Sequence, residues 1–407
     1  MINFRLLDNS SIDDSTPTAY RDFLYDIIQK TEAIEPAAYL DSSNIPSIGI
    51  GFNLTDENIR NLVLDKFGVA LDSDRIAIRN IVTDPHASNT ALQTALNAKM
   101  AELAGAGRAN RPTFAFAGGA AGVEEMRRVF NLAVQIYDQG YPDALGPTDR
   151  NGRVDAWLAG IPPSKERAVL VSLSYNGVIT AGKSPSLREA VLNGDRAEAW
   201  YEIRYNSNRL GNLVARGSTL NDEDQDKYDE GEDRGLAKRR YYESEVFGLY
   251  DNDNPISVSD AEARSVLQMY TRHRDAILKY EATYGVQPDG SAGSRGNMID
   301  QGETAYGTDI NTLPEALAVA RSTLIATEVS ARGVIRTIDG EVLVGQDVDY
   351  VTPTKTYRMN DTETLVGKDK NDLILGGAGN DRLEGGAGDD ILIGGDGEDT
   401  YVIQGHD

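Results

Sequence analysis

Residues 367–402 consist of four consecutive nine-residue units, GKDKNDLIL, GGAGNDRLE, GGAGDDILI and GGDGEDTYV. An aspartate occupies the sixth place of every unit, and a bulky apolar residue occupies the eighth: Asp372, Asp381, Asp390 and Asp399, then Ile374, Leu383, Leu392 and Tyr401. A glycine-rich segment is often a flexible linker, but a linker requires neither of these regularities. The strict period therefore predicts a repeating structure to which each unit contributes one turn.

The units resemble the RTX repeats of bacterial calcium-dependent secreted proteins, which form a parallel β-roll. Glycines permit the tight turns, aspartate and carbonyl oxygens are the hard ligands that Ca²⁺ prefers, and the apolar side chains stack inside. In such a roll, calcium lies between turns two units apart. The resemblance therefore implies that Asp372 shares an ion with the loop 385–390 and Asp381 with the loop 394–399. The aspartates of those loops complete about two structural, non-catalytic sites.

Calcium dependence and export belong together in this resemblance. Without calcium the clustered carboxylates repel one another, so we expect the repeats to be disordered until the ion binds. The resemblance implies type I secretion from a Gram-negative bacterium, with folding outside the cell. The start of the chain, MINFRLLDNSSIDDST, agrees, because it lacks the basic and apolar stretches of a secretory signal peptide. A secreted, extracellular protein is expected.

Composition excludes several functions. The chain has 407 residues and a formal net charge of −24, which argues against a nucleic-acid partner because phosphates require a Lys/Arg surface. The absence of cysteine removes disulfides and thiolate metal sites, and the three scattered histidines argue against a zinc site. No apolar run approaches the roughly 18 residues of a membrane span. We expect a monomer without a transmembrane segment.

A second informative stretch is TEAIEPAAYLDSSNIPSIGIGFNL, residues 31–54. Apolar spacing predicts a helix from Thr18 to near Glu32, followed by two short strands around the turn SSNI. Glu32 would then lie at the negative end of the helix dipole, which disfavours a charged carboxylate, as a general acid requires. Asp41, at a strand end beside a polar turn, would stay ionised.

Two carboxyl groups in contrasting environments suit the cleavage of a glycosidic bond. One protonates the leaving oxygen, and the other acts on water or on the sugar cation. Ser47, on the returning strand, could hold a water with its hydroxyl. On spacing alone, two solvated surface acids are the commoner explanation, because charged residues usually lie at the surface.

The same stretch resembles the active-site segment of the phage-type lysozymes, the muramidases of tailed bacteriophages and related endolysins. In that family a Glu closes the first helix, and Tyr-x-Asp and a Thr-Ile-Gly-x-Gly strand follow; the matching residues are Glu32, Tyr39, Asp41, Ile48, Gly49 and Gly51. The resemblance implies that Glu32 is the general acid, Asp41 the second carboxylate and Ser47 the water-positioning hydroxyl, with inverting stereochemistry. Tyr39 is a candidate substrate contact. Two positions depart from the pattern, Ala33 for the usual Gly and Phe52 for the usual His.

The resemblance continues more weakly over most of the first 250 residues, with insertions near 71–121 and 205–233. The segment GLAKRRYYESEVF resembles the closing helix of the family. Its Arg239 and Arg240 are candidate substrate-binding residues. Two alternatives are open for them: one pairs with Glu32 across the cleft, or both belong to an exposed basic face.

We therefore expect an α+β multidomain protein with three parts. Residues 1–250 form a mainly helical, two-lobed lysozyme-like glycoside hydrolase domain with a small N-lobe β-sheet. Residues 251–355 form a mixed helical and β accessory region of unknown role, in which Asp339-Gly340 between apolar runs predicts a two-residue hairpin. Residues 356–407 form the C-terminal parallel β-roll.

The leading hypothesis for function is a secreted, calcium-stabilised muramidase that hydrolyses the β-1,4 glycosidic bonds of peptidoglycan. The alternative is a non-catalytic, calcium-dependent protein that binds glycans or cell surfaces on a lysozyme scaffold. Retention of Glu32, Asp41 and a hydroxyl at Ser47 favours the enzyme, because a binding protein does not require that trio.

Overall fold

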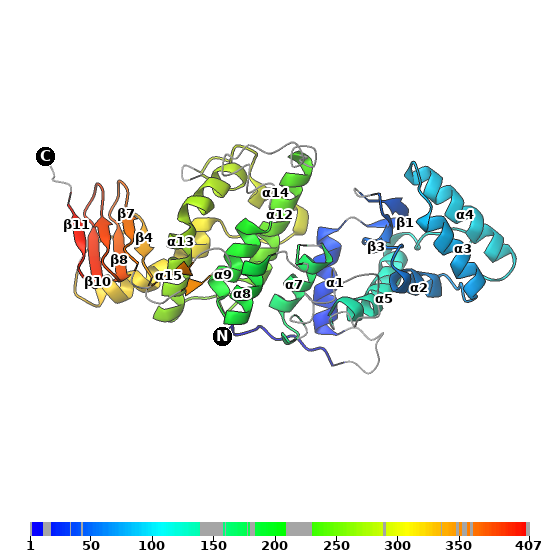
Figure 1. The fold of residues 1–407 in the computed structure, drawn as a ribbon, viewed down its shortest axis with the longest axis horizontal. Helices are drawn as coiled ribbons and strands as arrows, with labels where there is room; N and C mark the ends of the chain where they lie inside the picture. Colours follow the sequence, from blue (N-terminus) through cyan, green and yellow to red (C-terminus); the bar gives the residue numbers. More distant parts are fainter. Residues whose placement is uncertain are drawn as a thin grey trace. The chain divides into compact units, whose positions relative to one another are not determined.

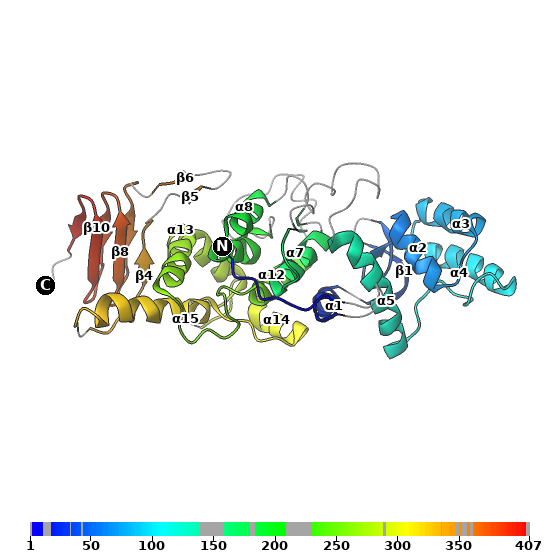
Figure 2. The same cartoon turned by 90° about the horizontal axis from the view of Figure 1, so that it is seen from below.

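The computed structural model describes residues 2–10, 18–32, 34–41, 44–138, 158, 160–176, 178–179, 184–208, 230–287, 290–334, 336–346, 350–351, 356–358 and 361–403. They form two compact units, Phe4–Lys183 and Ser184–Asp407, the second of which includes Met1–Asn3. We call these the N-terminal unit and the C-terminal unit and describe each by itself. The structure is mixed α/β, about half helical, with small sheets (Figures 1 and 2). The C-terminal unit contains residues on both sides of the boundary expected near residue 250.

The N-terminal unit combines a small antiparallel sheet with helices (Figure 1). The sheet has the order β1-β2-β3 and consists of β1 (Glu35–Leu40), β2 (Pro46–Gly49) and β3 (Phe52–Asn53). The helices are α1 (Ala19–Thr31), α2 (Glu57–Lys66), α3 (Asp72–Thr83), α4 (Asn89–Gly105), α5 (Gly119–Asp138) and α7 (Lys165–Tyr175). The predicted helix and hairpin of residues 18–54 are confirmed, with a third short strand added.

Helix α1 begins and ends where the sequence predicts. The Thr18 side chain accepts a hydrogen bond from the Arg21 N–H, which satisfies one of the free amides of the first turn. The helix buries one stripe, Tyr20, Leu24, Ile27 and Ile28, and its backbone turns extended at Glu32. It packs against α7, in which every residue from Ala168 to Leu173 is buried.

The stretch 71–121, expected from the resemblance to be an insertion, contains the helices α3 and α4. Their sequence signals are weak for identifiable reasons. Leu71 precedes α3 without a side-chain cap, so the usual start signal is missing. In α4 the residues Leu92, Leu96 and Met100 are buried, but amides and threonines are interspersed with them and blur the apolar stripe.

Helices form most of the C-terminal unit before residue 330. They are α8 (Pro185–Asn193), α9 (Arg196–Tyr201), α12 (Glu230–Phe247), α13 (Asp260–Tyr284), α14 (Met298–Tyr306) and α15 (Leu313–Leu324), with π-helical turns η1 (Glu202–Asn206) and η2 (Ile325–Ser330). Gly194, with φ of 79°, lies between α8 and α9 and ends α8. The Gly- and Asp-containing stretch before residue 309 includes a helix, α14, whose N-cap Asn297 accepts the Ile299 and Asp300 N–H groups. Most of the predicted insertion near 205–233 lies outside the described residues.

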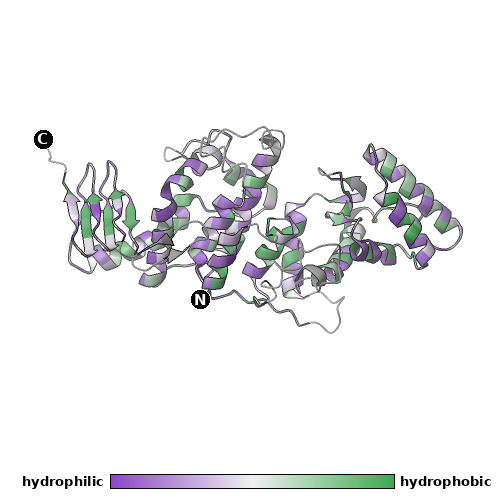
Figure 3. Cartoon of the chain, viewed as in Figure 1, coloured by the Kyte–Doolittle hydropathy of each residue, from purple (hydrophilic) through white to green (hydrophobic). Residues whose placement is uncertain are grey.

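The end of the chain forms a parallel β-roll of two sheets (Figures 1 and 2). One sheet has the order β10-β8-β4, built from β4 (Val342–Val344), β8 (Leu373–Ala378) and β10 (Ile391–Asp396). The other has the order β11-β9-β7, built from β7 (Thr364–Val366), β9 (Arg382–Glu384) and β11 (Thr400–Val402). Hydrophobic residues lie on these strands (Figure 3). A separate two-stranded pair, β5 (Tyr350–Val351) with β6 (Thr356–Tyr357), lies between β4 and β7 in the chain.

The hairpin predicted at Asp339-Gly340 is wrong. The residues after Gly340 form β4, which pairs in parallel with β8, so that Leu343 faces Ile374. The Gly340 N–H donates to the Asn371 carbonyl, as part of the same register. An apolar strand after Asp-Gly suits a hairpin locally, but here its partner lies about 30 residues further along the chain. The segment assigned to the accessory region therefore starts the roll.

One finding concerns membranes. Among the helices that the structure describes, none is long and apolar enough to cross a bilayer.

The eighth-place side chains make a test of the roll's core possible. Ile374 is fully buried, whereas Tyr401, at the same place of the last unit, is 47% exposed. We expect Ile374→Ala to lower the free energy of unfolding of the calcium-loaded C-terminal unit by about 2–5 kcal/mol, because it leaves a cavity. Tyr401→Ala should lower it by clearly less, as measured by urea unfolding at saturating calcium. Equal losses would contradict the interior stacking of this place.

Candidate calcium centre and candidate active site

The sixth-place aspartates of the roll join turns that are two units apart. Asp390 Oδ1 accepts the Asp372 N–H at 2.9 Å, and Asp399 Oδ1 accepts the Asp381 N–H at 3.0 Å. In each pair the partners are 18 residues apart, which is two units. One oxygen of Asp390 and one of Asp399 thus bind the backbone of the turn two units earlier.

The Oδ2 atoms of Asp372 and Asp381 each lie near a first-place glycine that a backbone carbonyl oxygen also approaches. A methyl group placed on Gly367 would overlap both Asp372 Oδ2 and the Gly385 carbonyl oxygen. A methyl group on Gly376 would approach Asp381 Oδ2 and the Gly394 carbonyl oxygen in the same way. Two acceptor oxygens therefore converge at the first-place glycine of each of these units, and the missing side chain leaves them room.

The loops themselves stack in the predicted pairs. The carbonyl of Lys368 faces Gly386, and that of Gly377 faces Gly395, so 367–372 lies on 385–390 and 376–381 lies on 394–399. Gly386 and Gly395 have φ values of 96° and 102°, a conformation that side-chain-bearing residues rarely adopt. The loop pairing expected for shared ions is confirmed as backbone geometry.

The chemistry of these loops fits calcium. Asp381 is 1% exposed, and its Oδ2 receives no hydrogen bond from the residues that the structure describes. Burial raises the pKa of both Asp372 and Asp381, as expected for carboxylates that lack a compensating cation. The carboxylate and backbone carbonyl oxygens that converge at Gly367 and Gly376 are hard ligands, which suit Ca²⁺ rather than a transition metal.

Two glutamates that the sequence analysis did not select also occupy the sixth place. Glu341 precedes β4 and Glu363 precedes β7, and the Glu363 N–H donates to Asp381 Oδ1 at 2.9 Å. The signal was available, because EVLVG at 341–345 and ETLVG at 363–367 share the pattern of DLILG at 372–376. Glu363 lies nine residues before Asp372 and keeps the nine-residue period, but its unit, RMNDTETLV at 358–366, has no glycine and has Glu in place of Asp. Only Glu341 is out of register, because 22 residues separate it from Glu363.

The two glutamates differ in their surroundings. Glu341 is paired with Lys368 Nζ at 2.8 Å and Arg274 Nη2 at 3.3 Å, and it accepts a hydrogen bond from the Tyr270 hydroxyl. These contacts hold the pKa of Glu341 below its usual value despite burial. Burial raises the pKa of Glu363 to about 6. The first turn of the roll thus has cations from the protein itself.

The comparison with known families bears on this segment. Residues 360–401 match the RTX calcium-binding nonapeptide repeat in four copies. They are RTX repeats. No curated protein and no solved structure matches the chain. The RTX repeats account for the roll and for its structural calcium.

The N-terminal unit brings together part of the predicted active site. Glu32 caps the C-terminus of α1, and its Oε1 accepts a hydrogen bond from Asn176 Nδ2 at 2.6 Å. Asn176 is the C-cap of α7. This residue is 144 positions from Glu32 and is not among the site residues predicted from the sequence. Its place at the end of a buried helix was the available signal.

The Tyr39 hydroxyl is affected by the charges of both predicted catalytic carboxylates. Burial, followed by the charges of Glu32 and Asp41, raises the pKa of its hydroxyl to about 12. A side-chain carbon on Gly51 would lie 3.5 Å from the Tyr175 hydroxyl and 4.0 Å from the Tyr39 hydroxyl. Tyr175 donates to the Ile50 carbonyl at 3.0 Å. Tyr39 is therefore a neutral hydrogen-bond donor that faces Gly51, next to the Glu32 and Asp41 charges.

Asp41 and Ser47 belong to the hairpin turn. Asp41 Oδ1 accepts the Ile45 N–H at 2.8 Å, and the Asp41 N–H donates to the Ile45 carbonyl at 3.0 Å. Ser47 is 3% exposed, and its hydroxyl donates to the Ile45 carbonyl at 3.3 Å. The turn fixes the backbone of Asp41. The water-positioning role of Ser47 stays a prediction.

Arg239 and Arg240 do not form an exposed basic face, so that alternative is wrong. They lie in α12 of the C-terminal unit, 4% and 0% exposed, and both pair with buried Glu243. Paired charges of this kind are expensive to separate in a low-dielectric interior. Substrate binding by these arginines stays a prediction.

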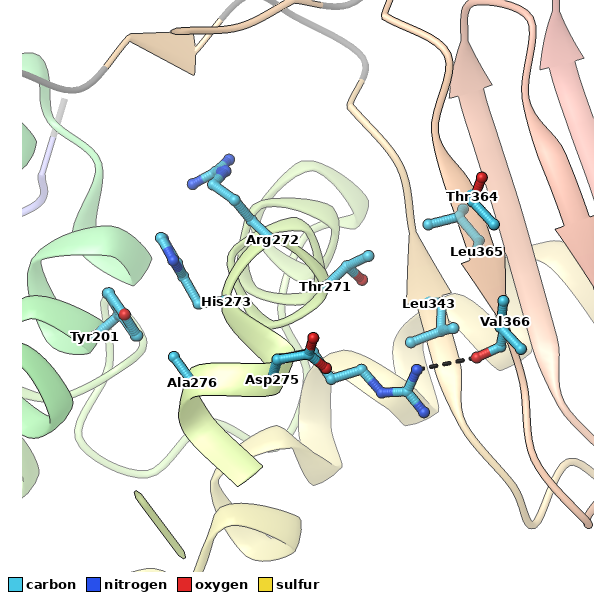
Figure 4. Close-up of a pocket in the computed structure, with 11 residues that line it drawn as sticks. Tyr201, Thr271, Arg272, His273, Asp275, Ala276, Leu343, Thr364, Leu365 and Val366 are labelled. Atoms are coloured by element: carbon cyan, nitrogen blue, oxygen red, sulfur yellow. Dashed lines mark hydrogen bonds between the residues drawn. The ribbon is translucent and has the colours of Figure 1, made fainter. Parts of the chain in front are cut away.

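A pocket of about 390 Å³ lies in the C-terminal unit beside α13, Leu343 and residues 364–366 (Figure 4). The ring of His273 stacks on the ring of Tyr201, with 3.8 Å between the two ring centroids, and His273 Nε2 lies 2.8 Å from Glu198 Oε1. Arg274 donates to the Val366 carbonyl at 2.9 Å (Figure 4). His273 and Arg274 thus form hydrogen bonds with other residues of the protein, and the bond from Arg274 connects α13 to the roll.

The calcium ligands can be tested one at a time. Asp381→Asn should weaken calcium binding to at least one site by ~10-fold or more, because the orphaned Oδ2 loses its charge. Isothermal titration calorimetry of the full chain measures the affinity and the number of ions. Asp300→Asn is the matched control, since Asp300 is an exposed residue of α14, outside the roll. Unchanged titration by Asp381→Asn would contradict the assignment.

Removal of calcium should unfold the repeats. With the ion chelated by EGTA, the stacked carboxylates and carbonyls repel one another, and the parallel strands lose their link. Circular dichroism with and without EGTA should show a loss of β signal that returns on addition of calcium. A roll that keeps the same spectrum in both conditions would count against the calcium centre.

Proposed function

We propose that the chain is a secreted, calcium-stabilised muramidase that hydrolyses the β-1,4 glycosidic bonds of peptidoglycan. The observation that carries the proposal is the arrangement around Glu32, whose carboxylate accepts from Asn176 and acts electrostatically on Tyr39 together with Asp41. Two carboxylates beside a neutral phenol form a group that general acid-base cleavage can use. The lysozyme resemblance of residues 31–54 supports the same reaction.

In the proposed mechanism Glu32 donates its proton to the glycosidic oxygen as the bond breaks. The Asn176 amide binds one oxygen of the Glu32 carboxyl and thereby orients this acid. Asp41 is the general base that activates the attacking water on the opposite face of the sugar, which gives the inverting course. Ser47 would help to hold that water. Tyr39 would donate a hydrogen bond to the sugar.

The roll has a separate part in this proposal. Type I secretion delivers the chain unfolded, and extracellular calcium then folds the RTX repeats. The calcium is structural, because the described calcium loops belong to the C-terminal unit and Glu32 belongs to the N-terminal unit. The substrate partner is the glycan strand of peptidoglycan, and the proposed active species is a monomer.

The test is cleavage of purified peptidoglycan by the full chain in the presence of calcium. Glu32→Gln should lower the rate by roughly 10²–10⁴-fold, because it removes the general acid while keeping an amide of the same shape. Turbidity clearing and the release of reducing sugars measure the rate.

The matched control is Glu35→Gln, which removes an exposed carboxylate three residues further along the chain. It should cut at nearly the wild-type rate. If wild type and Glu32→Gln are equally active, or both inactive, the enzymatic proposal fails. Calcium-dependent binding to peptidoglycan without cleavage would then point to a glycan-binding protein.

A further inference from the structure

Helix α4 carries three amide side chains at a spacing of four residues. They are Asn89, Gln93 and Asn97 in the sequence NTALQTALNAKM. Residues four apart lie on one face of a helix, so the three amides form a row, which we call the amide row. Leu92, Leu96 and Met100 form a parallel row that is buried. Helix α4 therefore packs into the interior through this apolar row, and the amide row lies next to it on the helix surface.

The amide row meets the outer edge of β1. This strand is an edge of the β1-β2-β3 sheet, and an edge strand has backbone donors and acceptors without a neighbouring strand. Asn89 Oδ1 accepts the Leu40 N–H at 2.5 Å, and Gln93 Nε2 donates to the Ala38 carbonyl at 3.0 Å. Two side chains thus pair one donor and one acceptor of the edge, as a fourth strand would.

The rest of the same edge is paired by the chain that follows α4. The Phe116 N–H donates to the Pro36 carbonyl at 2.8 Å, and Ala37 forms a bridge with Ala115. The third amide, Asn97, accepts the Phe114 N–H at 2.8 Å and so holds this segment. The edge of β1 is therefore covered from Pro36 to Leu40 by residues of one inserted region.

The position of these contacts connects them with the candidate active site. Ala38 and Leu40 flank Tyr39, and Leu40 precedes Asp41. The side chain of Tyr39 lies within the influence of Glu32 and Asp41. Fixing the backbone on both sides of Tyr39 therefore fixes the group that stands by the two carboxylates. A displacement of about 1 Å in such a group can lower a rate by roughly 10²-fold.

We propose that Asn89 and Gln93 are positioning residues, which clamp β1 from outside and hold Tyr39 and Asp41 in place for catalysis. The inference rests on the proposed muramidase function. It makes the inserted helical pair α3 and α4 a part of the catalytic apparatus, since α4 supplies both amides. Neither amide touches the reacting atoms; each acts through the backbone of β1.

The test uses the full chain with calcium and the double variant Asn89→Ala with Gln93→Ala. Its kcat on peptidoglycan should fall by about 10- to 100-fold with little change in KM. The Leu40 amide should exchange with deuterium faster than in wild type, because it loses its acceptor. The matched control is Thr94→Ala, which changes an exposed residue of the same helix whose hydroxyl donates to the Thr90 carbonyl within α4. This variant should have the wild-type kcat, and its Leu40 amide should exchange as slowly as in wild type.

Conservative variants separate positioning from simple destabilisation. Asn89→Asp still offers an acceptor, so Leu40 exchange should stay slow. Gln93→Glu removes the donor and places a carboxylate against the Ala38 carbonyl, so it should loosen β1 at neutral pH. Thermal unfolding of every variant is measured alongside, and the double variant should show a loss of kcat at a temperature where it is fully folded.

The outcomes distinguish the two proposals. Fast Leu40 exchange together with wild-type kcat in the double variant would overturn the positioning role. Unchanged Leu40 exchange would overturn the clamp itself, whatever the activity. A wild-type chain that cuts nothing would overturn the proposed function and with it the catalytic purpose of the clamp, while the exchange rates would still decide whether the clamp exists.

Discussion

The roll depends on bringing together oxygen atoms that repel each other. At Gly367 and Gly376 a carboxylate oxygen and a carbonyl oxygen approach from turns two units apart, and each is an acceptor. Hydrophobic stacking of residues such as Ile374 and Leu383 draws the turns together, but it cannot compensate for an unpaired charge that is held there. A divalent cation with hard-ligand preferences resolves the conflict, since it attracts both oxygens at once. Strand pairing, loop stacking and calcium affinity are thus three aspects of one arrangement.

In the turn that begins the roll, side-chain cations of the protein compensate the carboxylate charge. Glu341 occupies the aspartate place there, and its charge is compensated by Lys368 and by Arg274 of α13. The helix also accompanies the first strand directly, because Thr271 Oγ1 accepts the Val344 N–H at 2.9 Å and Gln268 donates to the Gly345 carbonyl at 2.8 Å. The helical part of the unit therefore provides a fixed first layer on which the calcium-dependent turns lie.

Sequence reasoning succeeded where a local pattern and the global structure have the same period. The nine-residue repeat determines the place of Asp372 and Asp381, and the 3.6-residue pattern determines α1 up to Glu32. It failed where the partner is remote. The strand after Gly340 was assigned to a hairpin because its true neighbour, β8, lies about 30 residues away. Asn176 was missed for the same reason, since its contact with Glu32 exists only in three dimensions.

The way in which α13 meets the roll has a consequence for how such a protein can change in length. Thr271 and Gln268 of the helix bond to the edge of β4, and Arg274 bonds to the Val366 carbonyl of β7, so one helix terminates both sheets at the same end. The strands β10 and β11 end the strand orders of the two sheets on the other side. Duplicated units can therefore be added at the β10–β11 end while the bonds from α13 to β4 and β7 stay the same. The number of turns, and with it the calcium capacity, is free to vary in evolution, while the helical layer at the other end remains the same.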